Sequence, residues 1–165
     1  PGFSARDVVL SHLSLPQDTY DSDAKVDIWY ESLLARLSSA AGVEAAALVS
    51  APPLVGAGDT AVHREGNAPA SDADRRFAQL RDVDGHYFAA LAMRVTSGRA
   101  FTPADRSGAP PVVIITEGMA REFFPQTNPV GQRLVIDRGE PTVAEVIGVV
   151  SDARLFGQAA STRSR

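Results

Sequence analysis

The chain has no cysteine among its 165 residues, which excludes disulfides, thiolate zinc sites and cysteine nucleophiles together. Basic residues are also few. The 16 lysines and arginines are outnumbered by 20 aspartates and glutamates, which gives a formal net charge of −4. Because sequence-independent binding of nucleic acid needs a basic surface, we expect no nucleic-acid partner.

Long hydrophobic runs are missing too. No run approaches the roughly 20 apolar residues that a membrane-spanning helix needs. The chain begins at Pro1 without a methionine. We therefore expect a piece of a longer protein, with any membrane anchor outside these residues. Apolar residues still make up 44% of the chain, enough for one packed domain or two small subdomains.

Recognisable catalytic and metal-binding motifs are absent from the sequence. The histidines His12, His63 and His86 fall on separate predicted elements without the spacing of a metal pair, so we interpret each as structural. The string Asp82-Val83-Asp84-Gly85 begins like a calcium loop, but no carboxylate follows at the required offset. Its second aspartate is predicted to cap a short helix instead. We therefore expect no catalytic residue, no cofactor, no metal and no enzymatic activity.

The first third of the chain predicts a strand, a helix and a second strand. In residues 8–15, Val9, Leu13 and Leu15 share one strand face, with Ser11 between them. Residues 23–41 carry apolar side chains at spacings of three and four, and residues 43–51 are small and apolar. Asp23 is placed to cap the helix and Gly42 to end it. A helix between two strands favours a right-handed crossover that leaves the strands parallel.

The remainder predicts short strands and short helices. Strands are expected over residues 61–65, 77–83, 93–95, 112–115, 133–136 and 143–150, and helices from Asp84 and over 117–124. Thr102-Pro103-Ala104-Asp105 has the signature of a capped helix start. Residues 54–59 form a glycine-rich loop, and the small, polar tail over 156–165 predicts a frayed end.

Two pairs of adjacent aromatic residues have two interpretations. One is that Tyr87 with Phe88, and Phe123 with Phe124, supply two layers of core. The other is that one ring of each pair packs on a second subdomain or on a partner. Under the second interpretation, these four residues and Phe101 are the candidate interface residues.

Short segments along the chain form an ordered set. They are residues 1–3, 29–37, 42–44, 48–54 and 87–91, Gly98-Arg99-Ala100-Phe101-Thr102 with Asp105, residues 111–115, Phe123-Phe124-Pro125, residues 128–134 and Ile147-Gly148-Val149-Val150. In this order they resemble the extracytoplasmic core domain of MacB/FtsX-like ABC-transporter permeases. The resemblance extends to about Gly157.

The resemblance implies an α+β fold with a porter-like strand-helix-strand module and an inserted mixed α/β subdomain. The first half of the porter-like subdomain is expected over residues 1–51, the inserted subdomain over 52–150, and a truncated or frayed tail over 151–165. In the family, a further strand, a helix and a closing strand follow, so we expect an incomplete porter half with an open sheet edge. Either a neighbouring copy pairs with that edge, or the strand-helix-strand unit packs directly on the insertion.

The resemblance also implies a function without catalysis. The domain is expected on the extracytoplasmic, periplasmic side of the bacterial cytoplasmic membrane, where it couples membrane motions to partner or substrate contact. Implied partners are the transmembrane helices of the same permease, a periplasmic adaptor and a cytoplasmic ATPase. The alternative is a stand-alone soluble binding module of related fold, which predicts a concave apolar pocket. A small hydrolase is a third hypothesis, and it needs His63 or His86 beside a carboxylate in a cleft.

Overall fold

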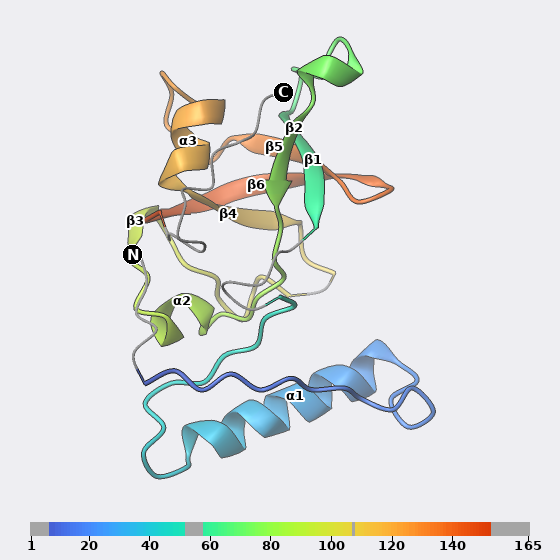
Figure 1. Cartoon of the computed structure of the whole chain (residues 1–165), viewed down its shortest axis with the longest axis vertical. Helices are drawn as coiled ribbons and strands as arrows, with labels where there is room; N and C mark the ends of the chain where they lie inside the picture. Colours follow the sequence, from blue (N-terminus) through green and yellow to red (C-terminus); the bar gives the residue numbers. More distant parts are fainter. Residues whose placement is uncertain (1–6, 52–57, 107, 153–165) are drawn as a thin grey trace.

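The computed structural model describes residues 7–51, 58–106 and 108–152 (Figure 1). In chain order its elements are α1 Asp23–Ser38, β1 Asp59–Arg64, the 3-10 turn η1 Asp72–Asp74, β2 Arg76–Gln79, α2 Tyr87–Ala90, β3 Val95–Gly98, β4 Val112–Thr116, α3 Glu117–Phe123, β5 Arg133–Asp137 and β6 Pro141–Val150. The six strands form one sheet in the order β2-β1-β5-β6-β3, with β4 paired to β6 off this path. The α+β fold class is therefore confirmed.

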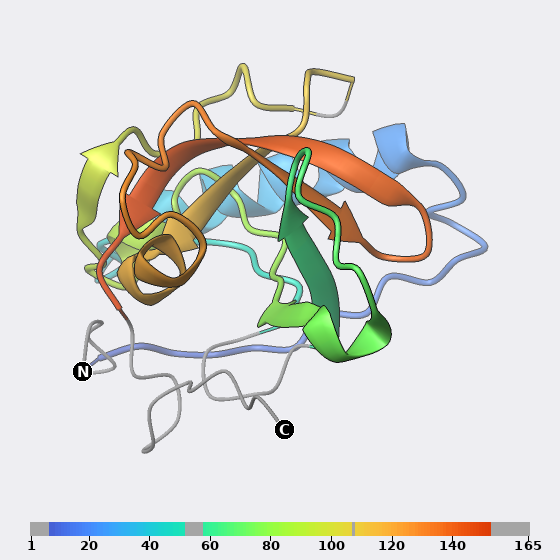
Figure 2. The ribbon, with the colours of Figure 1, turned by 90° about the horizontal axis from the view of Figure 1, so that it is seen from above.

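Strand β6 is the longest strand and joins the parts of the sheet. Its first half pairs antiparallel with β5, and its second half pairs parallel with β4 and antiparallel with β3. Glu145 lies opposite both Arg133 of β5 and Val112 of β4, so these two strands flank β6 on opposite sides. Irregular register in β3 and β4 bends the ladder, and Figure 2 shows β6 as a long curved strand through the sheet.

The larger core lies on one face of β1, β5 and β6, under α3. Leu134 and Val146 are completely buried there, and Phe123 and Phe124 pack against the same cluster. The Thr116 hydroxyl accepts the N–H of Met119 and so caps α3. The helix predicted over 117–124 is confirmed to within one residue.

A second, smaller core surrounds α2. Its buried members are Tyr87, Phe88, Leu91 and Val150. Asp84 accepts the backbone N–H of His86 in the turn ahead of the helix. The N-cap of α2 is His86, however, and no side chain caps the helix, so the prediction that Asp84 caps it is wrong. Because Val149 belongs to the larger core and Val150 to the smaller one, the end of β6 connects the two.

The two strands predicted on either side of α1 are not formed. Residues 8–15 are extended, but their backbone makes no hydrogen bond to another described residue, and Val9 is 92% exposed. Residues 43–51 contribute only an isolated bridge between Val49 and Val83. An extended segment becomes a strand only when a neighbour completes its ladder, and no described strand lies beside residues 8–15. The prediction of a parallel strand pair is therefore wrong for this structure.

Helix α1 is present where the periodicity predicts it, and Gly42 follows it with a φ of 85°. Its N-cap is Ser22 rather than Asp23. No residue of α1 belongs to either core, and Ile28 is 66% exposed. Figure 1 shows α1 apart from the sheet, with the extended N-terminal segment running along it. Among residues 7–51, only the segment after α1 packs against the smaller core, through Ala47 and Val49.

Three further predictions need correction. Thr102 begins a single turn rather than a helix, because the chain reverses at Gly108, with a φ of 84°, and then enters Pro110-Pro111. The strand predicted over 77–83 is shortened to Arg76–Gln79, and the one over 93–95 is displaced to Val95–Gly98.

Some predictions cannot be compared with the structure. The predicted glycine-rich loop over 54–59 lies mostly outside the described residues, and the predicted tail over 156–165 lies entirely outside them. The domain boundaries stay a prediction.

Candidate functional site

Histidines and carboxylates are scattered over the described residues. His63 lies on β1, His86 ahead of α2 and His12 in the N-terminal segment, and no hydrogen bond of the described part joins an imidazole to a carboxylate. Asp82 instead forms a two-point ion pair with Arg138. Within residues 7–51, 58–106 and 108–152, no group of three or more histidine or acidic side chains could hold a metal ion. This arrangement gives no support to the hydrolase hypothesis.

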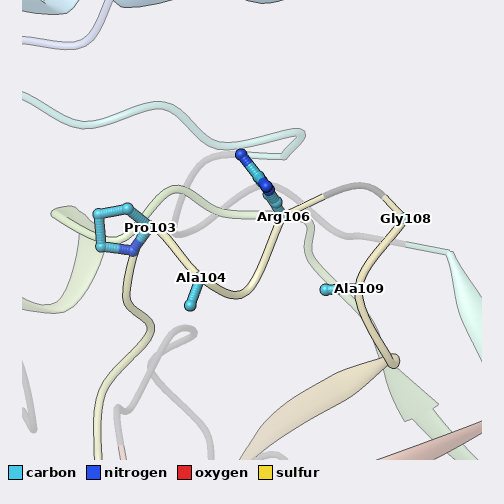
Figure 3. A pocket seen from close by; sticks show the side chains of 5 residues that line it. All are labelled: Pro103, Ala104, Arg106, Gly108 and Ala109. Atoms are coloured by element: carbon cyan, nitrogen blue, oxygen red, sulfur yellow. The ribbon is translucent and has the colours of Figure 1, made fainter.

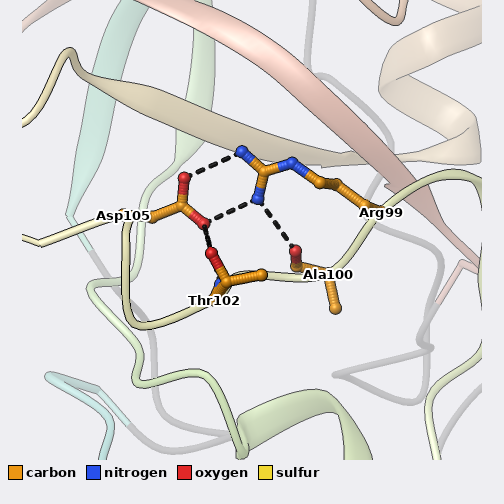
Figure 4. Close-up of polar contacts among 4 residues, drawn as sticks. All are labelled: Arg99, Ala100, Thr102 and Asp105. Atoms are coloured by element: carbon orange, nitrogen blue, oxygen red, sulfur yellow. Dashed lines mark hydrogen bonds and ion pairs between the residues drawn. The ribbon is translucent and has the colours of Figure 1, made fainter.

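The most strongly organised polar group is the loop after β3 (Figure 4). Asp105 Oδ2 accepts from Arg99 Nη1 at 2.6 Å, and Oδ1 accepts from Nη2 at 2.8 Å. Oδ2 also accepts from the N–H of Thr102 at 2.7 Å and from its hydroxyl at 2.9 Å. Arg99 Nη1 donates in addition to the carbonyl of Ala100 at 3.2 Å. We call these residues the Arg99–Asp105 clamp.

Within the clamp, Arg99 and Asp105 each stabilise the charged form of the other. The side chain of Asp105 is only 7% exposed. The Arg99 guanidinium, and after it the N–H of Thr102, hold the pKa of Asp105 well below its usual range. The hydrogen bond to Asp105 in turn raises the pKa of Arg99. A carboxylate held in this way is a poor general base, so the clamp stabilises the loop rather than supplying chemistry.

A contact between two glycines places the clamp against β6. Gly98 lies opposite Gly148 in the β3–β6 ladder, and the N–H of Arg99 donates to the carbonyl of Ile147 at 2.9 Å. A Cβ added at Gly98 would collide with the carbonyl oxygen of Ile147, and one at Gly148 with the carbonyl oxygen of Arg99. Only glycine at both positions permits this approach. Sequence reasoning placed both glycines in matching segments without detecting that they meet.

Two open hollows lie beside the same loop. The larger, of about 560 Å³, is lined by Pro103, Ala104, Arg106, Gly108 and Ala109. Figure 3 shows the side chains of Arg106 and Ala104 on opposite sides of this loop. The smaller, of about 290 Å³, lies between residues 81–85 and 101–112, and charged side chains line much of it. Neither hollow is the concave apolar pocket that a small-molecule binding module predicts.

The candidate interface residues are mostly inside the molecule. Tyr87, Phe88, Phe123 and Phe124 are each between 4% and 9% exposed, while Phe101 is partly buried and stacks on Phe88 at a centroid distance of 6.1 Å. Burial raises the pKa of Tyr87, against an opposing effect of the Arg81 charge. This burial favours the interpretation as two layers of core. Their role as an interface stays a prediction.

No helix in the described part of the chain is both long enough and apolar enough to cross a membrane. Comparison with known proteins nevertheless leads to membrane transporters. The chain is 34% identical over 73 residues to an uncharacterised ABC transporter permease, YknZ of Bacillus subtilis. That alignment covers 44% of this chain and 18% of the permease.

Solved structures of similar fold come from the same class of protein. The periplasmic region of MacB from Actinobacillus actinomycetemcomitans matches 74% of this chain and 50% of its own, with a TM-score of 0.55 and 20% identity. The extracellular domain of the non-canonical ABC-type transporter YknZ from Gram-positive bacteria matches 74% of this chain and 57% of its own, with a TM-score of 0.50 and 25% identity. This chain therefore spans about half the length of these solved domains.

The family comparison covers nearly the whole sequence. Residues 5–164 match the family described as the MacB-like periplasmic core domain. The family match and the solved structures agree on an extracytoplasmic location and on an ABC permease as the parent class. The chain belongs to the MacB-like periplasmic core domain family.

Proposed function

We propose that this domain is a non-catalytic coupling element, which links motions of a permease's membrane helices to contact with a partner or substrate. The observation that carries the proposal is the construction of β6. It passes from the larger core to the smaller one. The glycine contact and the N–H of Arg99 attach β3 to it, and the Arg99–Asp105 clamp holds the loop that follows β3. A strand embedded in two cores transmits displacement better than a loop does, because packed interiors deform little.

The N-terminal region supports the second half of the proposal. Residues 8–15 and helix α1 expose apolar side chains, among them Val9, Leu10 and Ile28. In a coupling element, such a region is the part that moves relative to the sheet and meets neighbouring structure. The transmembrane helices of the same permease, a cytoplasmic ATPase and a periplasmic adaptor are the partners proposed for the whole protein. A neighbouring copy is a further candidate for the unpaired segment over 8–15.

The test is a distance measurement in the full-length permease, reconstituted with its ATPase in lipid nanodiscs. These 165 residues have no cysteine, so once any cysteine elsewhere in the permease is replaced, spin labels at Ser11→Cys and Glu140→Cys are the only ones. Coupling predicts that the label distance changes between nucleotide-free and ATP-bound states. A matched pair at Gln79→Cys, the last residue of β2, and Glu140→Cys, in the tight turn between β5 and β6, should keep its distance. Constant distances in both pairs would refute the proposal.

A simpler observation separates the proposal from the stand-alone binding module. A permease domain requires hydrophobic membrane spans in the protein that contains it. The encoded sequence on both sides of these 165 residues should therefore contain segments of roughly 20 apolar residues. A full-length protein without such segments would favour the soluble module.

A further inference from the structure

The outer face of the sheet carries an apolar group that the two cores do not use. Val62, Leu134 and Ala144 point into the larger core, so their neighbours in sequence point to the opposite face. The strand register aligns His63 with Val135 and Val135 with Val143, and it sets Phe77 beside Ala61. The apolar side chains of Ala61, Phe77, Val135 and Val143, joined by His63 of β1, form a continuous group across β2, β1, β5 and β6. We call these five residues the outer patch.

The outer patch is open to solvent. Phe77 is 48% exposed and Val143 is 39% exposed, although both are apolar. Helix α3 packs on the inner face, α2 belongs to the smaller core, and α1 lies apart from these strands (Figure 1). Single exposed apolar residues are ordinary on a protein surface, but here the partly exposed Ala61, His63 and Val135 on β1 and β5 connect Phe77 to Val143.

Negative charge surrounds the outer patch. On one flank, Arg133 lies between Glu65 and Glu145 in the cross-strand row, and its Nη1 is 3.4 Å from a Glu65 carboxylate oxygen. On the other flank, the carboxylates of Asp59 and Asp137 belong to the same face. On this face of the strands and at the positions next to them, these four carboxylates lie around Arg133. Arg75, just before β2, is paired with Asp72 at 3.1 Å, and Arg81 donates to Gln79 and to the carbonyl of Ala51, so negative charge stays in excess. Arg99 lies near Glu145, but its guanidinium is already bound by Asp105.

This charge pattern discriminates between three possible binding partners of the surface: a second copy of the chain, a lipid surface and a segment of another protein. Two copies that met face to face would bring like charges together, and an anionic lipid surface would be repelled. An apolar centre with an acidic border fits an apolar segment bordered by positive charge. We propose that the outer patch docks a polypeptide segment of a partner, with apolar residues on Phe77 and Val143 and lysine or arginine against the acidic border.

The test uses the whole 165-residue chain and a synthetic amphipathic helical peptide with a leucine stripe flanked by lysines. Fluorescence anisotropy measures its affinity, and amide chemical-shift changes locate the contact. The variant Asp59→Asn, Asp137→Asn, Glu145→Gln removes three charges from the border. The matched control Asp18→Asn, Asp27→Asn, Glu31→Gln changes the net charge equally at exposed positions of the N-terminal region. Thermal melts verify that both variants remain folded.

The lysine peptide is expected to perturb amides of β1, β2, β5 and β6. The border variant should weaken its binding about tenfold, because exposed charge pairs contribute modestly one by one and three of them are removed together. The control should bind as the unchanged chain does. The proposal is overturned if the same peptide with glutamates binds equally well, or if both variants lose affinity alike. Self-association through the patch by sedimentation, or variant-sensitive binding to phosphatidylglycerol vesicles, would overturn it too.

Discussion

The N-terminal region, residues 7–51, and the sheet region, residues 58–152, have similar apolar sequence patterns but bury their apolar side chains to very different extents. In the sheet region, every strand has a hydrogen-bonded neighbour and 14 hydrophobic residues are buried. In the N-terminal region, none of the described residues is buried, and most of the large exposed hydrophobic residues lie there. An apolar pattern therefore predicts which face of an element can be buried. Whether that face is buried depends on a packing partner elsewhere in the chain, which the pattern does not identify.

The largest expected difference between the regions comes from glycine substitutions. Gly148→Ala should destabilise the fold by about 4 kcal/mol or prevent folding, because its Cβ meets the Arg99 carbonyl in a ladder that cannot yield. Gly42→Ala should cost about 1 kcal/mol, since Gly42 has a φ of 85° but no atom close to an added Cβ. Urea denaturation of both variants measures the contrast. Equal losses would show that the two regions are equally constrained.

The same contrast explains what the sequence could predict. Elements stabilised by near neighbours in the chain were found: α1 from its periodicity, α3, predicted over residues 117–124 with its stop at Pro125, and β4 from its apolar run. Elements that depend on distant partners were not. The strand at 8–15 and the parallel pair around α1 need a neighbour that no local pattern identifies. The helix expected at Thr102 became a turn because Gly108 and two prolines redirect the chain.

For the candidate site, sequence reasoning recognised the components but not their contacts. The capping bonds of Asp105 to Thr102 follow from local spacing, and they are present. The two-point pairing of Asp105 with Arg99 requires the turn geometry, and the meeting of Gly98 with Gly148 requires the sheet register. The outer patch also depends on register, because Phe77 and Val143 are 66 positions apart in the sequence and lie on strands β2 and β6.

Replacing one paired aspartate in each region should also affect the free energy of unfolding differently, but by less than the glycine substitutions do. The pKa of Asp105 is lowered in the folded state, so its contribution is present above the unfolded value near 4 and is lost as pH falls through the folded pKa. Asp105→Asn should therefore cost about 2 kcal/mol at neutral pH, through its charge-assisted hydrogen bonds, and should flatten the fall in stability below about pH 4. Chemical denaturation across that pH range measures both effects.

The matched control for Asp105 lies in the N-terminal region. Asp21 pairs with Lys25 at 2.8 Å, but its side chain is 59% exposed. Asp21→Asn should change the free energy of unfolding by less than about 0.5 kcal/mol, since solvent screens such a pair. If Asp21→Asn and Asp105→Asn altered the acid profile equally, the clamp would have no special role.

The smallest expected effect compares the ends of the two helices. After α1, the residue with positive φ is Gly42; after α2 it is Ala92, with a φ of 52°. There the N–H of Met93 donates to the carbonyl of Phe88 and that of Ala92 to Ala89, the bonding of a Schellman motif. Glycine is the favoured residue at this position, because a side chain in the left-handed region costs about 1 kcal/mol.

Ala92→Gly should therefore stabilise the sheet region by about 0.5 kcal/mol, the relief of strain exceeding the added freedom of the unfolded chain. Ala90→Gly, two residues earlier and inside α2, should destabilise it by about 1 kcal/mol. Opposite signs in paired denaturation curves would show that α2 is held by its local backbone geometry as well as by the smaller core. A loss of stability in both variants would mean that the methyl group of Ala92 contributes packing that outweighs its backbone strain.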